Sequence, residues 1–412
     1  MAAGRQTLTP AELRAAGRLG GLVFAGLVAR IGQVHQVIAD RAFAPVGLAG
    51  APIRLIHDSV ARSAYLTLRG VGVAAGAVGG EAGFVLGRGG LSAGREPGGN
   101  LALAVLNAVA GDRLGADLAP LAIGMAVRAH GCDVGLTAEQ IAGAFPHATP
   151  RLAVFVHGLA ETEHSWHRRA GQSVPYGRRL QAEFGYTPVY VRYNTGRHIS
   201  DSGHDLAGLL DGLAAAWPVQ VEEILLVGHS MGGLVIRSAC HYGREASAAW
   251  VGYIRHVFYL GSPHLGAPLA RAAGRAGWVL GQVPETRPFA ALATGPAAVK
   301  DLRHGYVLDD EWAGCDQDCC LRDHRRDAPL LAEANHYAIS GTVTADPASP
   351  IGAVIGDLLV QPASAHGLRG ARQHIPLPVE LARRLGGMHH FDLLNHPDVW
   401  QAMRGLLRPA AR

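Results

Sequence analysis

The sequence lacks several features that would assign it to a specialised class of protein. Its 412 residues include only five cysteines, an odd number that argues against a disulfide framework. The net charge is only +4 and the basic residues do not form a stripe, so nucleic-acid binding has no support. We find no internal repeat, no P-loop and no glycine fingerprint of a dinucleotide-binding fold. Nearly half of the residues, 49%, are apolar, so the chain can bury a large globular core.

Long apolar runs are also absent. The stretch 19–29 is too short to span a bilayer and is followed directly by Arg30. Arg5, Arg14 and Arg18 precede it, as in a signal peptide, but no convincing small-residue cleavage site follows. We therefore expect a cytoplasmic or membrane-associated protein without a signal peptide or a transmembrane helix.

The first 150 residues differ in composition from the rest. Alanine, glycine, leucine and valine predict helices at about 13–40, 55–70 and 100–110, and the glycine-rich stretch 70–99 suits a loose helical hairpin or a connector. Small residues four positions apart favour tight helix–helix packing. Peripheral contact with a membrane surface is the alternative for this accessory region.

Two threonines resemble helix N-caps in this part of the chain. Thr9 precedes Pro10, with Glu12 three positions after the threonine, and Thr137 precedes Gln140 at the same spacing. We expect a helix to begin after each of them.

Residues 224–239 carry the most informative pattern. An apolar run breaks at Gly228-His229-Ser230-Met231-Gly232-Gly233, and a small-residue helical pattern follows. This predicts a strand, a sharp turn with Ser230 at its apex, and a helix. Side chains two positions to either side of Ser230 would clash, which explains Gly228 and Gly232. The pattern is typical of a nucleophilic serine whose following N–H groups face developing negative charge.

A serine nucleophile needs a histidine base, a carboxylate that orients the histidine, and N–H donors for the oxyanion. A second apolar run, 152–156, ends at His157-Gly158-Leu159. We expect the backbone N–H groups of Leu159 and Met231 to form the oxyanion hole. His157 precedes the serine, against the expected order serine, acid, histidine, so we expect His157 and Gly158 to support the loop.

Two aspartates are candidates for the acid. Asp346 directly follows the strand-like run 337–342, where topology would place it. Asp357 lies in Gly356-Asp357-Leu358-Leu359-Val360, where an apolar hook would bury the carboxylate against the histidine. We prefer Asp357 and keep Asp346 as the alternative.

Several histidines follow Asp357, namely His366, His374, the pair His389-His390, and His396. His390 fits a catalytic base best, because a glycine pair at 386–387 precedes it and an apolar helix start follows. His389 is the alternative, and His396 resembles a helix-boundary residue. A metal site of His389, His390, Asp392 and His396 is disfavoured because adjacent histidine side chains diverge, so we expect no metal.

The remaining pattern predicts a parallel sheet flanked by helices. Further strand-like runs at 187–193 and 254–260 alternate with helical patterns around 175–184, 203–217 and 232–242. We expect an α/β fold with a mostly parallel sheet from residue 151 to the C-terminus.

From Arg151 onward, the chain resembles α/β-hydrolase lipases and esterases, especially bacterial triacylglycerol-lipase-like proteins. The motifs that carry this resemblance lie at 157–159, 228–233, 261–264, 356–360 and 390–397. It implies an α/β-hydrolase fold over 151–412, no cofactor, and a triad of Ser230, His390 and Asp357. It also implies an oxyanion hole at Leu159 and Met231.

An insertion at about 268–335 is expected to form a helical cap over the nucleophile, because this fold commonly carries a cap there. The alternative is a surface excursion without catalytic meaning. Cys315, Cys319 and Cys320 lie in it and match no motif of the family; free thiols or one local disulfide are favoured over a metal site. His264 precedes the insertion and is expected to be a structural loop histidine.

The expected activity is hydrolysis of a small-molecule or lipid carboxylic ester through an acyl-enzyme. Acyl transfer, thioester hydrolysis and cleavage of polyhydroxyalkanoate-type polyesters use the same site and are the alternatives. A scaffold or membrane-binding protein with a decayed hydrolase domain is the non-enzymatic alternative, and it is disfavoured because serine, aspartate and histidine candidates are all present.

Overall fold

The computed structural model describes residues 10–43, 50–86, 97–112, 122–168, 172–268, 270–272, 295–314, 323–369, 372–373 and 375–408. The chain divides into two compact units, Met1–Leu103 and Ala104–Arg412. Each unit is described by itself below.

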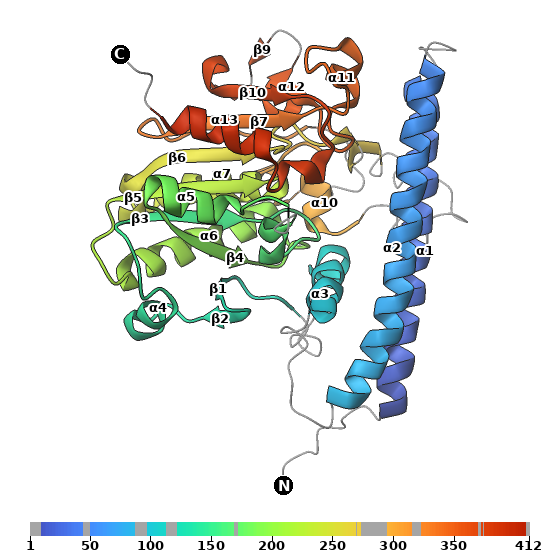
Figure 1. The fold of residues 1–412 in the computed structure, drawn as a ribbon, viewed down its shortest axis with the longest axis horizontal. Coiled ribbons are helices and arrows are strands. Elements are labelled where there is room, and N and C mark those ends of the chain that lie inside the picture. Colours follow the sequence, from blue (N-terminus) through green and yellow to red (C-terminus); the bar gives the residue numbers. More distant parts are fainter. Residues whose placement is uncertain are drawn as a thin grey trace. The chain divides into compact units, whose positions relative to one another are not determined.

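The first unit contains two long helices that run side by side (Figure 1), α1 (Pro10–Phe43) and α2 (Ala51–Leu86). Both are longer than the sequence pattern predicts. Helix α2 continues through Gly70 to Leu86, so the described part of the glycine-rich stretch is regular helix. Residue Thr9, the expected N-cap of α1, lies outside the described residues.

Glycines allow the backbones of α1 and α2 to approach each other closely. A Cβ added at Gly17 would lie 2.5 Å from the backbone nitrogen of Gly80, and one at Gly76 would lie 2.6 Å from the Cα of Gly21. No real side chain tolerates such contacts, so these positions require glycine. The small residues expected to serve tight helix packing do so between these two helices.

The outer surface of α2 is unusually apolar. Leu55 is 70% exposed, Ile56 65% and Leu66 64%. Among the described residues, no helix combines the length and apolar character that crossing a membrane requires. Contact of this region with a membrane surface stays a prediction.

The second unit is built around an eight-stranded sheet in the order β2-β1-β4-β3-β5-β6-β7-β10. Strands β3 to β7 and β10 pair in parallel, whereas β1 pairs antiparallel with both β2 and β4. The expected mostly parallel sheet is therefore confirmed. The strands are β1 (Ala126–Ala129), β2 (Cys132–Val134), β3 (Arg151–Val156), β4 (Thr187–Arg192), β5 (Glu223–His229), β6 (Ile254–Leu260), β7 (Asn335–Gly341) and β10 (Ala382–Leu385).

The boundary expected at residue 150 falls inside this second unit. Strands β1 and β2 precede residue 150 and extend the sheet, so they belong to the second unit. Both strands are too short to give a clear pattern in the sequence. The turn between them is typical of a β-hairpin, because His130 and Gly131 both have positive φ, 50° and 76°. Helix α3 (Pro97–Ala110) crosses the boundary between the units.

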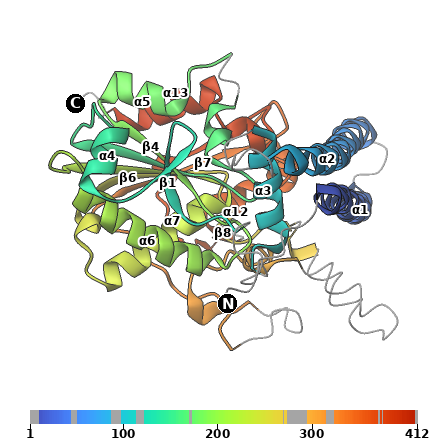
Figure 2. The ribbon, with the colours of Figure 1, turned by 90° about the horizontal axis from the view of Figure 1, so that it is seen from below.

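Helices cover both faces of the sheet. Helices α6 (Ile199–Ala216) and α7 (Met231–Glu245) lie on one side of the strands, and α5 (Tyr176–Phe184) and α13 (Pro397–Leu407) on the other (Figure 2). Alternate residues of β3 face the two sides: Leu152, Val154 and Val156 join the α6–α7 core, whereas Ala153 and Phe155 join the α5–α13 core. The shorter helices are α4 (Ala138–Ala144), α10 (Ala297–Asp301), α11 (Pro350–Ile355) and α12 (Pro362–Ala365), and a separate two-stranded sheet joins β8 (Leu368–Arg369) to β9 (Arg372–Gln373).

The described parts of the expected cap pack onto helices of the sheet. Ala298, Leu302 and Val307 join the core beside α6 and α7. The Ser238 hydroxyl of α7 donates to the carbonyl of Val307 at 2.6 Å. Residues 273–294 and 315–322, with Cys315, Cys319 and Cys320, lie outside the described residues, so a cap over the nucleophile stays a prediction.

Thr137 is the N-cap of α4, as expected, since its hydroxyl accepts the backbone N–H of Gln140 at 3.3 Å.

The glycine contacts between α1 and α2 predict position-specific effects on stability. Gly76→Ala should lower the free energy of unfolding by about 1–3 kcal/mol, because its Cβ would lie 2.5 Å from the Gly17 carbonyl oxygen. Gly79→Ala is the matched control, since nothing lies within 4 Å of its added Cβ, and helix propensity should make it neutral or stabilising. Urea unfolding followed by far-UV circular dichroism measures both. Equal stability of the two variants would contradict the proposed close contact.

Candidate active site

Ser230 occupies a strained turn between β5 and α7. Its φ of 52° and ψ of −123° are rare for a residue with a side chain. The turn is fixed from both sides: the Ser230 N–H donates to the Leu260 carbonyl at 2.8 Å, and the Gly233 N–H donates to the Ser230 carbonyl at 3.1 Å. The strand, turn and helix predicted around Ser230 are therefore present.

Gly228 and Gly232 make this turn possible. A Cβ at Gly228 would lie 2.5 Å from the nitrogen of Gly233, and one at Gly232 would lie 2.2 Å from the Val156 carbonyl oxygen. Either side chain would push β5, α7 or the end of β3 apart. Glycine is therefore required at both positions for steric reasons, as the sequence pattern predicts.

Asp357 and His390, 33 positions apart, meet as a buried pair. The Nδ1 atom of His390 lies 2.7 Å from Oδ2 of Asp357, and the two side chains are only 3% and 1% exposed. The other carboxylate oxygen accepts the N–H groups of Leu359 at 3.0 Å and Val360 at 2.8 Å. The His390 N–H also donates to the Asp357 carbonyl at 2.9 Å, so backbone and side chain are both held.

This pairing determines the chemistry of the His390 ring. An ionised carboxylate only accepts hydrogen bonds, so Nδ1 must carry a proton and Nε2 of the neutral ring keeps its lone pair. Burial lowers the pKa of His390, but the Asp357 charge and hydrogen bond outweigh burial and the pKa is raised overall. The ring is thus a competent general base whose protonated form Asp357 stabilises.

The alternative acid and histidines lie elsewhere. Asp346 is exposed, and its carboxylate accepts the N–H of Ala348. His389 is 42% exposed and pairs with Asp392 at 3.1 Å. His396 caps α13, and His366 contacts the Ser340 hydroxyl at 3.0 Å. His374 lies outside the described residues.

Ser230 and His390 approach the same end of β6. Ser230 bonds to Leu260, the last residue of the strand, and a Cβ at the next residue, Gly261, would lie 3.2 Å from Cε1 of His390. Among the described residues the Ser230 hydroxyl forms no hydrogen bond with the His390 ring. A nucleophile and its base often reach hydrogen-bonding distance only with substrate bound.

The loop after β3 lies against the nucleophile. A Cβ at Gly158 would lie 3.0 Å from the Cβ of Ser230, which brings the Leu159 backbone beside the turn. His157 is fully buried and stacks on Tyr193 with ring centroids 4.6 Å apart. The Tyr193 hydroxyl donates to the His157 carbonyl at 2.8 Å. His157 thus belongs to the support of this loop, and its backbone is held from the neighbouring strand.

Sequence reasoning missed Glu161. Its carboxylate accepts the Gly158 N–H at 2.8 Å and lies 2.9 Å from Nδ1 of His229. The only sequence signal is an acidic residue three positions after Gly158.

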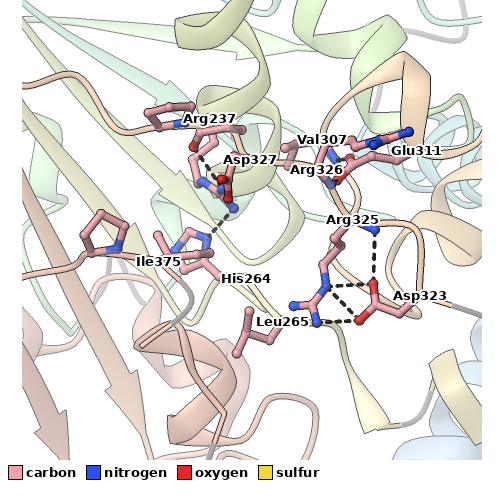
Figure 3. A pocket seen from close by; sticks show the side chains of 14 residues that line it. Arg237, His264, Leu265, Val307, Glu311, Asp323, Arg325, Arg326, Asp327 and Ile375 are labelled. Atoms are coloured by element: carbon pink, nitrogen blue, oxygen red, sulfur yellow. Dashed lines mark hydrogen bonds and ion pairs between the residues drawn. The ribbon is translucent and has the colours of Figure 1, made fainter. Parts of the chain in front are cut away.

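The structure also contains a cavity of about 640 Å³ (Figure 3). Its wall is charged, and the residues that contribute to it include Arg237, His264, Glu311, Asp323 and Arg325. The Arg237 guanidinium contacts Nδ1 of His264 at 3.5 Å and the Ala328 carbonyl at 3.3 Å. Neither Ser230, Asp357 nor His390 lines this space. His264 is buried beside Arg237, and its role as a structural loop histidine stays a prediction.

No group of three or more histidine, cysteine, aspartate or glutamate side chains is arranged to hold a metal within the described ranges. Of the cysteines in those ranges, Cys132 and Cys240 are both free thiols.

Comparisons with known proteins concern the fold of the second unit. Residues 209–275, which contain Ser230, match the model of the PGAP1-like alpha/beta domain. No curated protein sequence matches the chain.

Several solved structures are similar in fold. The mature lipase BlEst2 of Bacillus licheniformis has 19% identity and a TM-score of 0.41, covering 64% of this chain and 95% of its own. The thioesterase RedJ of Streptomyces coelicolor has 19% identity and a TM-score of 0.35, covering 63% and 91%. The naproxen esterase of Bacillus subtilis has 14% identity and a TM-score of 0.33, covering 64% and 85%.

The strand order, the strained turn between β5 and α7 at Ser230, and the chain order serine, aspartate, histidine are independent of these distant likenesses. Together they assign the second unit to the α/β-hydrolase fold.

Proposed function

We propose that this protein hydrolyses carboxylic esters through an acyl-enzyme on Ser230. The observation that carries the proposal is the buried Asp357–His390 pair, at 2.7 Å, next to a strained serine turn. A buried aspartate on Nδ1 leaves Nε2 of His390 as the acceptor for a serine proton.

The first half of the reaction forms the acyl-enzyme. His390 takes the proton of the Ser230 hydroxyl as its oxygen bonds to the ester carbonyl carbon. The carbonyl oxygen becomes an oxyanion that accepts hydrogen bonds from the N–H groups of Leu159 and Met231. The imidazolium then gives its proton to the leaving alcohol as the carbon–oxygen bond breaks.

The second half returns the enzyme to its starting state. His390 removes a proton from water, which attacks the acyl carbon, and the oxyanion forms again at the same two N–H groups. Collapse expels the Ser230 oxygen, which takes back the proton, and releases the carboxylic acid.

Ser230→Ala should lower kcat for p-nitrophenyl esters by roughly 10⁶-fold and abolish labelling by a fluorophosphonate probe, because the nucleophile is gone. An unchanged circular dichroism spectrum and melting temperature serve as the folding control. Retained turnover would remove Ser230 from the mechanism, and product analysis with alcohol or amine acceptors would reveal acyl transfer.

The two aspartates should differ sharply. Asp357→Asn should lower kcat by about 10⁴-fold, because an amide at 357 favours the wrong tautomer of His390. Asp346→Asn is the matched control and should remain near the wild-type rate, since its carboxylate is exposed and bonds only to a local N–H. The opposite ranking would assign the acid to Asp346.

The pH profile should report the raised pKa of His390. Only the neutral ring accepts the serine proton, so kcat/KM should fall as the pH drops through this pKa, with a midpoint above the ordinary histidine value of 6.5. Asp357→Asn should shift the midpoint to lower pH, because the stabilising charge is lost. A wild-type midpoint below 6.5 would contradict this assignment.

A further inference from the structure

Glu161 joins two segments of the candidate active site. Its side chain is 8% exposed, and Oε2 accepts the N–H of Gly158 in the loop that carries Leu159. Both carboxylate oxygens also approach Nδ1 of His229, at 2.9 and 3.1 Å. His229 is the residue directly before Ser230, so one carboxylate links the oxyanion loop to the nucleophile turn.

His229 extends this link to a third segment. Its Nε2 atom lies 3.2 Å from the backbone carbonyl oxygen of His390, and the two imidazole rings are 4.7 Å apart between centroids. The serine turn is thereby connected to the chain segment that bears the base.

The hydrogen-bond partners of His229 determine its protonation. The Glu161 carboxylate and the His390 carbonyl can both only accept hydrogen bonds, so both ring nitrogens of His229 must donate. A neutral imidazole has one donor and one acceptor. The His229 side chain is fully buried, so bulk water does not reach a ring nitrogen that would lack a hydrogen-bond donor.

We propose that Glu161 and His229 form a buried ion pair, an inference that rests on the proposed function. The pair positions the oxyanion loop, the serine turn and the catalytic histidine relative to one another. Both are positioning residues, since both side chains are buried.

The surroundings of Glu161 favour its ionised state. Burial acts to raise the pKa of its carboxyl, but the facing His229 ring and the Gly158 N–H outweigh burial and lower the pKa to about 2. A buried pair of opposite charges is tolerated where each partner is fully hydrogen-bonded, whereas loss of one partner leaves an uncompensated charge.

Substitutions of Glu161 separate its hydrogen bonds from its charge. Leucine has a similar size but leaves the Gly158 N–H and the His229 ring without their acceptor. Glutamine can accept the Gly158 N–H through its oxygen and donate its amide to Nδ1 of a neutral His229, whose Nε2–H still donates to His390.

Histidine nitrogen NMR tests the ion pair without any enzymatic assay. With ¹⁵N-labelled histidine, both His229 nitrogens should show protonated-type shifts in the wild type, and only one in Glu161→Gln. The signal is identified by its loss in His229→Gln. A singly protonated His229 in the wild type would overturn the ion pair.

Steady-state kinetics on p-nitrophenyl esters test the positioning role. Glu161→Leu should lower kcat about 100-fold, because displaced catalytic groups lose near-attack geometry, whereas KM should change little. Glu161→Gln should restore most of the rate. Glu222→Leu, at an exposed glutamate outside the site, is the matched control and should match the wild type.

A folded Glu161→Leu variant with wild-type kcat would overturn the positioning role, as would a loss confined to KM. If Glu161→Leu fails to fold, a Glu161→Gln variant with a kcat as low as that of Ser230→Ala would also overturn the hydrogen-bond model. A wild-type protein without esterase activity would contradict the proposed function, while the NMR experiment would still decide the ion pair.

Discussion

The close approach of three backbone segments at Ser230 is the constraint on which the site depends. The end of β3, the end of β5 and the start of α7 meet within distances that leave no space for a Cβ at Gly228 or Gly232. This contact holds Ser230 at a φ of 52°. The parallel sheet supplies the rigidity that maintains this strain, because β5 is hydrogen-bonded on both sides.

The carboxylates buried near Ser230 and His390 are paired. Asp357 faces His390 and accepts two N–H groups, and Glu161 faces His229 and accepts one. Such pairing offsets the cost of removing charge from water and fixes the direction of each ring. Arg237 differs: its guanidinium is buried beside the charged cavity, and its described hydrogen bonds go to a neutral ring nitrogen and a carbonyl.

Local patterns predicted much of the second unit. The apolar runs that became β3, β5, β6 and β7 are continuous because both faces of these strands are covered by helices. The sequence pattern did not predict strands β1, β2 and β10. Each has two to four residues that are not fully buried, so its hydrophobic periodicity is weak. The boundary expected at residue 150 also lies too late in the chain. The pairing of β1 with β4 joins segments more than 60 residues apart, and no local pattern in the sequence indicates such pairing.

The sequence by itself determined the serine turn, since the glycines around Ser230 are required by short-range steric contacts. It also narrowed the acid and the base to a few candidates. Only the tertiary structure decided that Asp357 meets His390 while Asp346 and His389 face outward, and only it revealed the Glu161–His229 pair. Hydrogen bonds between residues 33 to 161 positions apart depend on how the loops converge at the ends of the strands, which composition and periodicity do not encode.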